Sequence, residues 1–229
     1  MQVNSIVHLR KYLRMVKICF IAGTLLLLLN SGQLAFSQNK PMDQASIETL
    51  KKRVKEVAQN TRTLSCDFVQ VKEMSMIAEK ITSSGKFYLK KEKMLRWEYL
   101  KPFSYLIVIR NDQISIKDDN KVNQFNVQSN KLFLEINRII LGSIQGTLLT
   151  DEKNFRASYF ESPTAWVVKL VTLNARLRES LNEVIIYFNR EDFAVGRVDM
   201  NESGGDCTKI TFTSRKTNQP IADEKFLVN

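Results

Sequence analysis

Apolar and polar residues alternate with a period of two along most of this chain. The clearest example is residues 94–109, MLRWEYLKPFSYLIVI, where two apolar runs flank a Lys-Pro turn. This period is typical of β-strands with one buried face, and short polar links between such runs indicate antiparallel neighbours. The pattern predicts strands at residues 64–71, 81–90, 95–100, 105–110, 113–117, 121–127, 155–161, 165–172, 183–189, 194–201 and 208–214.

Two segments have the period of a helix instead. Asp43 can cap a helix that extends to about Asn60, with apolar residues at positions 47, 50, 54 and 57 on one side. The second segment is residues 131–145, KLFLEINRIILGSIQ, whose apolar residues form one broad stripe. The residues of this stripe are Leu132, Phe133, Ile136, Ile139, Ile140 and Ile144.

One helix, a series of strands, an inserted helix and more strands predict a mainly β protein with helices, an α+β fold. So many antiparallel strands are expected to curl into a barrel or half-barrel. The inserted helix needs a large apolar surface to lie on, and the concave face of a curled sheet would supply one. Patterning alone nevertheless favours an ordinary packing of helix on sheet, with a filled interior, over an open cavity.

The first 37 residues differ from the rest in composition. A basic start without acids precedes an apolar run at residues 18–29, and Ala35-Phe36-Ser37 follows. This order is typical of a secretory signal peptide, and the run is too short to span a bilayer. We therefore expect cleavage after Ser37 and a single domain over residues 38–229. Loss of four basic residues would lower the formal charge from +10 to +6.

The expected mature chain is moderately basic and lacks histidine, because His8 belongs to the signal peptide. Without histidine, Ser-His-Asp and Cys-His nucleophiles and histidine-based metal sites are excluded. No enzyme activity, cofactor or metal is predicted. A secreted protein is not expected to bind nucleic acid. Its charge suits anionic lipid head groups, acidic glycans or an acidic protein, and it serves solubility equally well.

Two cysteines, Cys66 and Cys207, remain after the expected cleavage. In an oxidising compartment they permit one disulfide, which would join the first strand to one of the last. A pair of buried thiols fits the sequence about as well.

Several short motifs follow one another in a characteristic order. GKFYLKK at residues 85–91, LRWEYLKP at 95–102 and LIV at 106–108 are preceded by Phe68-x-Gln70 and followed by TFTS at 211–214. This set resembles the periplasmic outer-membrane lipoprotein carrier family. The resemblance implies an unclosed, strongly curved antiparallel half-barrel with a helical lid over an apolar cavity. It also implies a periplasmic carrier of acylated lipoproteins. Its implied partners are an inner-membrane lipoprotein-releasing complex and an outer-membrane acceptor or the outer membrane itself.

The resemblance and the alternation together give the candidate site. The predicted cavity residues are Phe87, Leu89, Leu95, Trp97, Tyr99 and Ile107. The predicted lid residues are Leu132, Phe133, Ile136, Ile140 and Ile144. Arg96 and Glu98 alternate with the cavity residues and are expected on the solvent side of their strand.

The sequence departs from the family at the residue that holds the lid shut. The family often has Arg-Pro after its glycine-led strand, where the arginine forms hydrogen bonds to the lid; Lys91-Glu92 stands here instead. Lys91 is therefore the candidate latch, with a point charge in place of a rigid fork. Because related proteins share this fold, the cargo can also be another lipid or a glycolipid. A lipid-sensing domain that transports nothing is a further alternative.

Overall fold

The computed structural model describes residues 39–77, 79–91, 94–111, 113–118, 121–126 and 131–228, apart from the side chains of residues 125–126 and 131–137. The predicted signal peptide lies outside these residues. No helix in the described part of the chain is both long and apolar enough to cross a membrane.

Two long helices stand where the sequence predicts them. α2 (Gln44–Asn60) begins at Asp43, whose Oδ1 accepts a hydrogen bond from the Ser46 N–H at 2.7 Å. This bond lowers the pKa of Asp43, as is usual for an N-cap carboxylate. The second long helix is α3 (Lys131–Gln145). Three shorter helical segments were not predicted: η2 (Thr147–Thr150), α4 (Ala175–Arg178) and η3 (Asp223–Phe226).

The described strands form one antiparallel sheet, and every predicted strand has a counterpart in it. The strands are β1 (Lys40–Pro41), β2 (Thr63–Met74), β3 (Glu79–Lys90), β4 (Met94–Lys101), β5 (Tyr105–Arg110), β6 (Gln113–Asp118), β7 (Lys121–Asn126), β8 (Phe155–Glu161), β9 (Ala165–Thr172), β10 (Leu181–Asn189), β11 (Val195–Glu202) and β12 (Cys207–Thr217). Their order is β1-β8-β9-β10-β11-β12-β2-β3-β4-β5-β6-β7. The centre of the sheet is thus the pair of β2 and β12, where Phe68 lies opposite Phe212.

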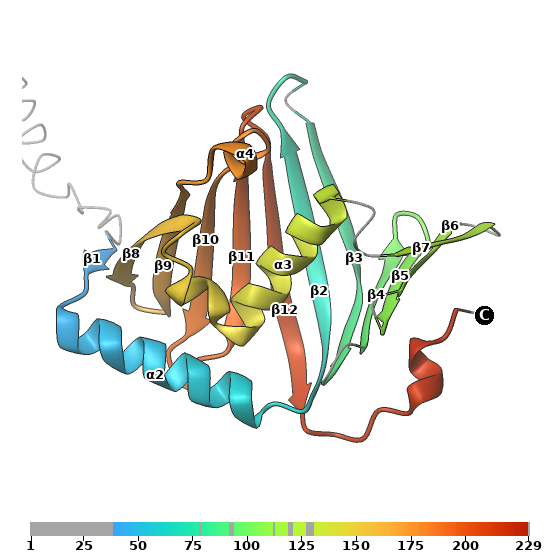
Figure 1. Ribbon diagram of the computed structural model, residues 1–229, viewed down its shortest axis with the longest axis horizontal. Coiled ribbons are helices and arrows are strands. Elements are labelled where there is room, and N and C mark those ends of the chain that lie inside the picture. Colours follow the sequence, from blue (N-terminus) through green and yellow to red (C-terminus); the bar gives the residue numbers. More distant parts are fainter. Residues whose placement is uncertain are drawn as a thin grey trace, which may run out of the picture. The chain divides into compact units, whose positions relative to one another are not determined.

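The sheet is curled but not closed. β1 and β7 are its two edges, and within the described residues they do not pair with each other. Figure 1 shows α3 lying across the concave face, while α2 crosses the strands near one end. The predicted mainly β fold, with an unclosed curved sheet and helices over its concave side, is confirmed.

The main hydrophobic core lies between the concave face and the two long helices. Leu50 and Val54 of α2 are buried there together with Phe68, Phe188 and Ile210 of the sheet. Alternation explains this arrangement, because every second residue of a strand points to the same face.

The convex face carries a smaller core, formed by Leu106 and Val108 of β5 with Phe226 of η3. The C-terminal segment that contains η3 also covers Arg96. The Nη1 of Arg96 donates to the carbonyl oxygens of Lys225 and Leu227 at 3.3 Å each. The prediction that Arg96 faces solvent was therefore wrong. The residue lies on the expected face of the strand, but the C-terminal segment folds over that face.

The cysteines do not form the disulfide that the sequence allowed, since Cys66 and Cys207 are both free thiols. Cys207 lies opposite Glu73, seven residues along β2 from Cys66, which corresponds to about 23 Å along a strand. The register also places the two side chains on opposite faces of the sheet. Burial raises the pKa of the Cys66 thiol to about 12, so Cys66 is a buried neutral thiol.

Candidate functional site

Aromatic rings of β2, β3 and β4 form the centre of the concave wall. The Trp97 ring stands edge-on to Phe68 and to Phe87, with centroids 5.1 Å apart in each pair. Tyr99 stands edge-on to Phe68 at 5.0 Å, and these two rings meet above Gly85, which pairs with both residues. Edge-to-face contacts of this kind fix the mutual orientation of the rings. The wall is therefore a packed aromatic surface.

Helix α3 forms the roof over this wall. Ile139 and Ile140 are 3% and 4% exposed, and Ser143 Oγ donates to the Ile139 carbonyl at 2.6 Å. The helix ends at Gln145, and the next residue is Gly146, where φ is +70° and an added Cβ would lie 2.6 Å from Val54 Cγ1. Glycine is therefore required both for the left-handed turn and for the close approach of α2.

A cavity of about 440 Å³ lies between the wall and the roof. Its apolar lining comes from strands on both sides of the central strand pair and from α3. Among the lining residues are Trp97, Tyr99, Ile107, Ile140, Met200 and Ile210. The volume lies within the range of about 300–1,000 Å³ that is usual for sites of small apolar ligands.

A second cavity, of about 320 Å³, lies beside the first and shares Leu95 with it. It extends towards the C-terminal ends of α2 and α3, with Leu89, Leu141 and Ile144 in its lining. Lys91 lines this cavity as well. Its Nζ donates to the carbonyl oxygens of Ala58 and Gln59 at 3.4 and 3.0 Å. A cation at a helix C-terminus is favourable, so Lys91 fastens the end of α2 to the sheet.

One end of the larger cavity is polar. Tyr99 Oη donates to Gln70 Oε1 at 3.0 Å, and burial raises the pKa of Tyr99, which keeps the phenol neutral. Lys72 Nζ lies 3.0 and 3.1 Å from the two carboxylate oxygens of Glu202. Burial acts to lower the pKa of Lys72, but the hydrogen bond and charge of Glu202 outweigh it, and the net pKa is raised. No cluster of acidic, cysteine or histidine side chains in the described part of the chain has the arrangement of a metal site.

The structure brings most of the predicted site residues together. Leu95, Trp97, Tyr99 and Ile107 line the larger cavity, and Leu89 lines the second. Phe87 is a correction: its side chain is 0% exposed, packs against Trp97 and Phe212, and lines neither cavity.

The predicted roof residues are placed only in part. Ile140 lines the larger cavity and Ile144 the second. The side chains of Leu132, Phe133 and Ile136 lie outside the described residues.

Sequence reasoning missed the C-terminal half of the lining. Met200, Thr208 and Ile210 reach the cavity from β11 and β12, and Leu177 reaches it from α4. It also missed the polar residues at the cavity's end. The available signal was the alternation in β2, because Gln70 and Lys72 continue the face that begins with Leu64, Cys66 and Phe68.

Comparisons with known proteins give one family and a consistent fold. A model of the family described as outer membrane lipoprotein carrier protein LolA matches residues 59–229. No curated protein matches the chain.

Solved structures with a similar fold include MucB, with 12% identity and a TM-score of 0.51 over 81% of this chain and 64% of MucB. An uncharacterized conserved protein from Thermus thermophilus has 12% identity and a TM-score of 0.50 over 79% of this chain and 92% of its own. A LolA superfamily protein from Nitrosomonas europaea has 7% identity and a TM-score of 0.43 over 80% and 97%. At such identities the likeness concerns the fold alone.

Proposed function

The chain belongs to the outer membrane lipoprotein carrier protein family, and on this premise we propose that it is a non-enzymatic carrier of lipoproteins. It binds their acyl chains in the cavity under α3 and carries them across the periplasm from the inner to the outer membrane. The observation that carries this proposal is the cavity itself, which is walled by aromatic and aliphatic side chains and covered by one apolar helix. Walls of this kind bind acyl chains mainly through the hydrophobic effect.

A carrier must bind its cargo firmly and still release it. Each acyl methylene that leaves water gains about 0.8 kcal/mol, so several chains together would be held too tightly for delivery. Here the ligand must displace contacts that already exist, because Ile139 and Ile140 are nearly fully buried against the wall. The lost contacts offset part of the gain and bring the bound and released states closer in free energy.

The proposed transport from the inner to the outer membrane implies two partners. A chain exported by its signal peptide would receive acylated lipoproteins from an inner-membrane releasing complex. It would deliver them to an outer-membrane acceptor or to the outer membrane itself.

The proposal is tested by identifying what the protein carries. We expect mass spectrometry of protein purified from the periplasm to detect acylated lipoproteins. We also expect depletion of the protein to leave lipoproteins at the inner membrane. Co-purification of free lipid or glycolipid, with normal lipoprotein sorting after depletion, would replace lipoproteins by another lipid cargo.

A stationary binding domain is the second candidate. MucB, which has a similar fold over 64% of its length, has been crystallised in complex with MucA. A protein of that kind would bind a partner protein and would transfer no lipid between membranes. Transfer of a labelled lipoprotein from inner-membrane to outer-membrane vesicles separates the two functions.

We propose that Lys91 acts as a latch of the covered state indirectly: it holds the end of α2, and α2 packs against the end of the roof helix α3 at Val54 and Gly146. Lys91→Leu removes the contacts to the end of α2, so bound acyl ligand should be released about fivefold faster, while the free energy of unfolding changes by less than about 1 kcal/mol. Stopped-flow measurement of ligand release gives the rate.

The matched control for the latch is Lys90→Leu. Lys90 is the neighbouring residue, but its Nζ donates to the Ile221 carbonyl at 3.1 Å. Equal release rates in Lys91→Leu and the unaltered protein would remove the latch role.

A further inference from the structure

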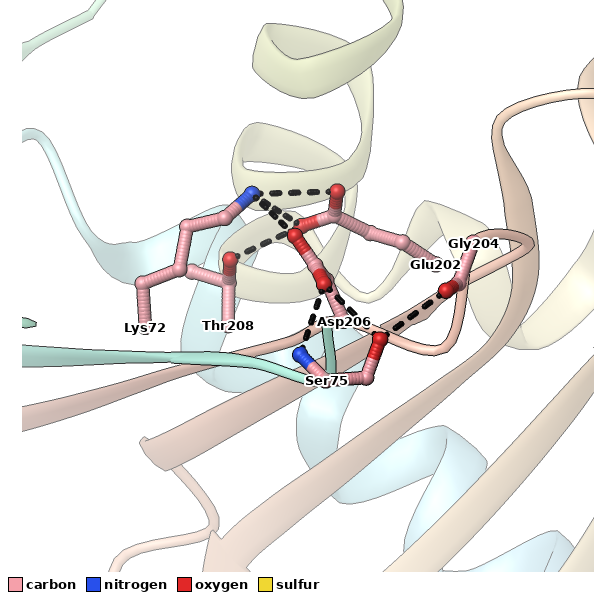
Figure 2. A network of polar contacts seen from close by, with 6 residues as sticks. All are labelled: Lys72, Ser75, Glu202, Gly204, Asp206 and Thr208. Carbon is pink, nitrogen blue, oxygen red and sulfur yellow. Dashed lines mark hydrogen bonds and ion pairs between the residues drawn. The ribbon is translucent and has the colours of Figure 1, made fainter. Parts of the chain in front are cut away.

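The polar end of the larger cavity is an ordered network of side chains. Figure 2 shows Lys72 reaching both Glu202 and Asp206, the latter at 3.6 Å from Nζ. Thr208 Oγ1 donates to Glu202 Oε1 at 3.0 Å, and the Ser75 N–H donates to Asp206 Oδ1 at 3.0 Å. Each carboxylate is thus held by a second group besides Lys72. The ion pair is fixed in place before any ligand arrives.

This network lines the cavity and is also in contact with solvent. Lys72, Glu202 and Thr208 belong to the cavity lining, while the Lys72 and Glu202 side chains remain 33% exposed. Gln70 of the same strand, which accepts from Tyr99, lines the cavity next to Lys72. The polar groups therefore form a continuous path from the aromatic wall to the surface.

Stability alone does not account for an ion pair in this position. Partly exposed pairs contribute little to folding, and charges at the edge of an apolar cavity carry a desolvation cost. A few fixed polar groups in an otherwise apolar pocket are instead the usual means of orienting a ligand.

The chemistry of the pair selects one kind of polar group. Lys72 offers a donor and Glu202 an acceptor, about 3 Å apart. Two successive peptide groups in extended backbone present the complementary set, because the N–H and the C=O of the residue between them point to the same side. An ester linkage has acceptors but no donor, so it can accept from Lys72 but cannot donate to Glu202.

We propose that the Lys72–Glu202 pair binds the first peptide groups of an acylated polypeptide whose acyl chains occupy the cavity. This inference rests on the proposed function and adds to it a binding site for the polypeptide. Acyl chains lie against Trp97 and Ile140, and the polypeptide leaves the cavity at the end of β2 and β11. Recognition is by backbone groups, so it is independent of the side chains of the cargo.

The test compares two ligands that share an acyl chain. N-palmitoyl-diglycine amide carries peptide groups, and palmitic acid methyl ester does not. Affinity is read from Trp97 fluorescence in a Trp166→Phe background, since Trp97 lines the cavity. We expect the amide to bind about tenfold more tightly than the ester. The double variant Lys72→Met/Glu202→Met should lose this preference and keep its affinity for the ester.

A matched control exists on β2 and its other neighbour in the network, β12. Lys209 and Glu73 form an ion pair at 2.9 Å, with exposures of 32% and 31%, on the convex face. Lys209→Met/Glu73→Met should keep the tenfold preference. Glu202→Gln, a milder change, should reduce the preference about threefold without altering the unfolding midpoint.

Three results would overturn the inference. Equal affinity of the unaltered protein for the two ligands would show that peptide groups are not recognised. If the Lys72→Met/Glu202→Met variant lost affinity for both ligands equally, the pair would only support the fold. Binding of neither ligand by the unaltered protein would overturn the acyl-carrier function and this inference with it. Ester binding without preference leaves the carrier function standing.

Discussion

Gly85→Ala should destabilise the protein by about 3 kcal/mol, because the added methyl group has no space. A Cβ at this position would lie 1.8 Å from the backbone oxygen of Glu98 and 2.9 Å from the Tyr99 Cα. These are backbone atoms of the neighbouring strand, so β3 and β4 would have to move apart. The shift would also separate Phe68 and Tyr99, which meet above this glycine. Equilibrium denaturation measures the loss.

Gly196→Ala is the control for this substitution. Gly196 also lies in a strand, but its added Cβ would have only ordinary contact with the Tyr187 oxygen, at 3.7 Å. We expect a change below about 1 kcal/mol there, since alanine costs less backbone entropy than glycine. Similar stabilities of the two variants would show that the approach of β3 to β4 is easily relaxed.

Ile140→Glu should lower the affinity for acyl ligands about 100-fold while the β-sheet stays folded. The substitution puts a carboxylate in the roof of the cavity, where acyl methylenes would have to desolvate it, and removes an aliphatic contact. Ile140 is only 4% exposed but lines the cavity, so we expect the longer glutamate side chain to extend into that space and to be hydrated there when no ligand is bound. Titration followed by Trp97 fluorescence measures affinity, and circular dichroism monitors the sheet.

The control adds the same charge just beyond the helix. Thr147 is exposed in η2 and lines neither cavity, so Thr147→Glu should leave affinity unchanged within about twofold. If Ile140→Glu unfolds while Thr147→Glu does not, Ile140 is a core residue and α3 is not a roof. Unaltered affinity in folded Ile140→Glu would place the acyl chains elsewhere.

The sheet was predictable because alternation records which face of a strand is buried. Leu95, Trp97 and Tyr99 were assigned to the cavity face from the alternation together with the family resemblance, and all three line the cavity. Alternation does not show, however, whether a side chain on that face reaches the cavity or is covered by other side chains. Phe87 shares that face but lies beneath Trp97 and Phe212, and the contact with Phe212 depends on a strand more than a hundred residues away.

The polar end could not be predicted for a related reason. Lys72 and Glu202 are 130 residues apart, and they meet because Thr208 pairs with Lys72 and with Met200. Strand register sets these contacts, and the local pattern does not specify register between distant strands. The sequence left the disulfide open for the same reason, because it does not give the register between β2 and β12. In the structure Cys207 pairs with Glu73 and not with a residue near Cys66, which excludes the disulfide.

The pairing of β2 with β12 at the centre of the sheet has a consequence for the order of folding. Phe68 and Phe212 lie opposite each other although 144 residues (212 minus 68) separate them. Until β12 is available, the strands from β2 to β7 and those from β8 to β11 are two ribbons without a common edge. Closing so long a loop is entropically costly and slow. A chain threaded through a membrane with its N-terminus first would therefore be unable to complete this sheet on the far side before its last strand had emerged.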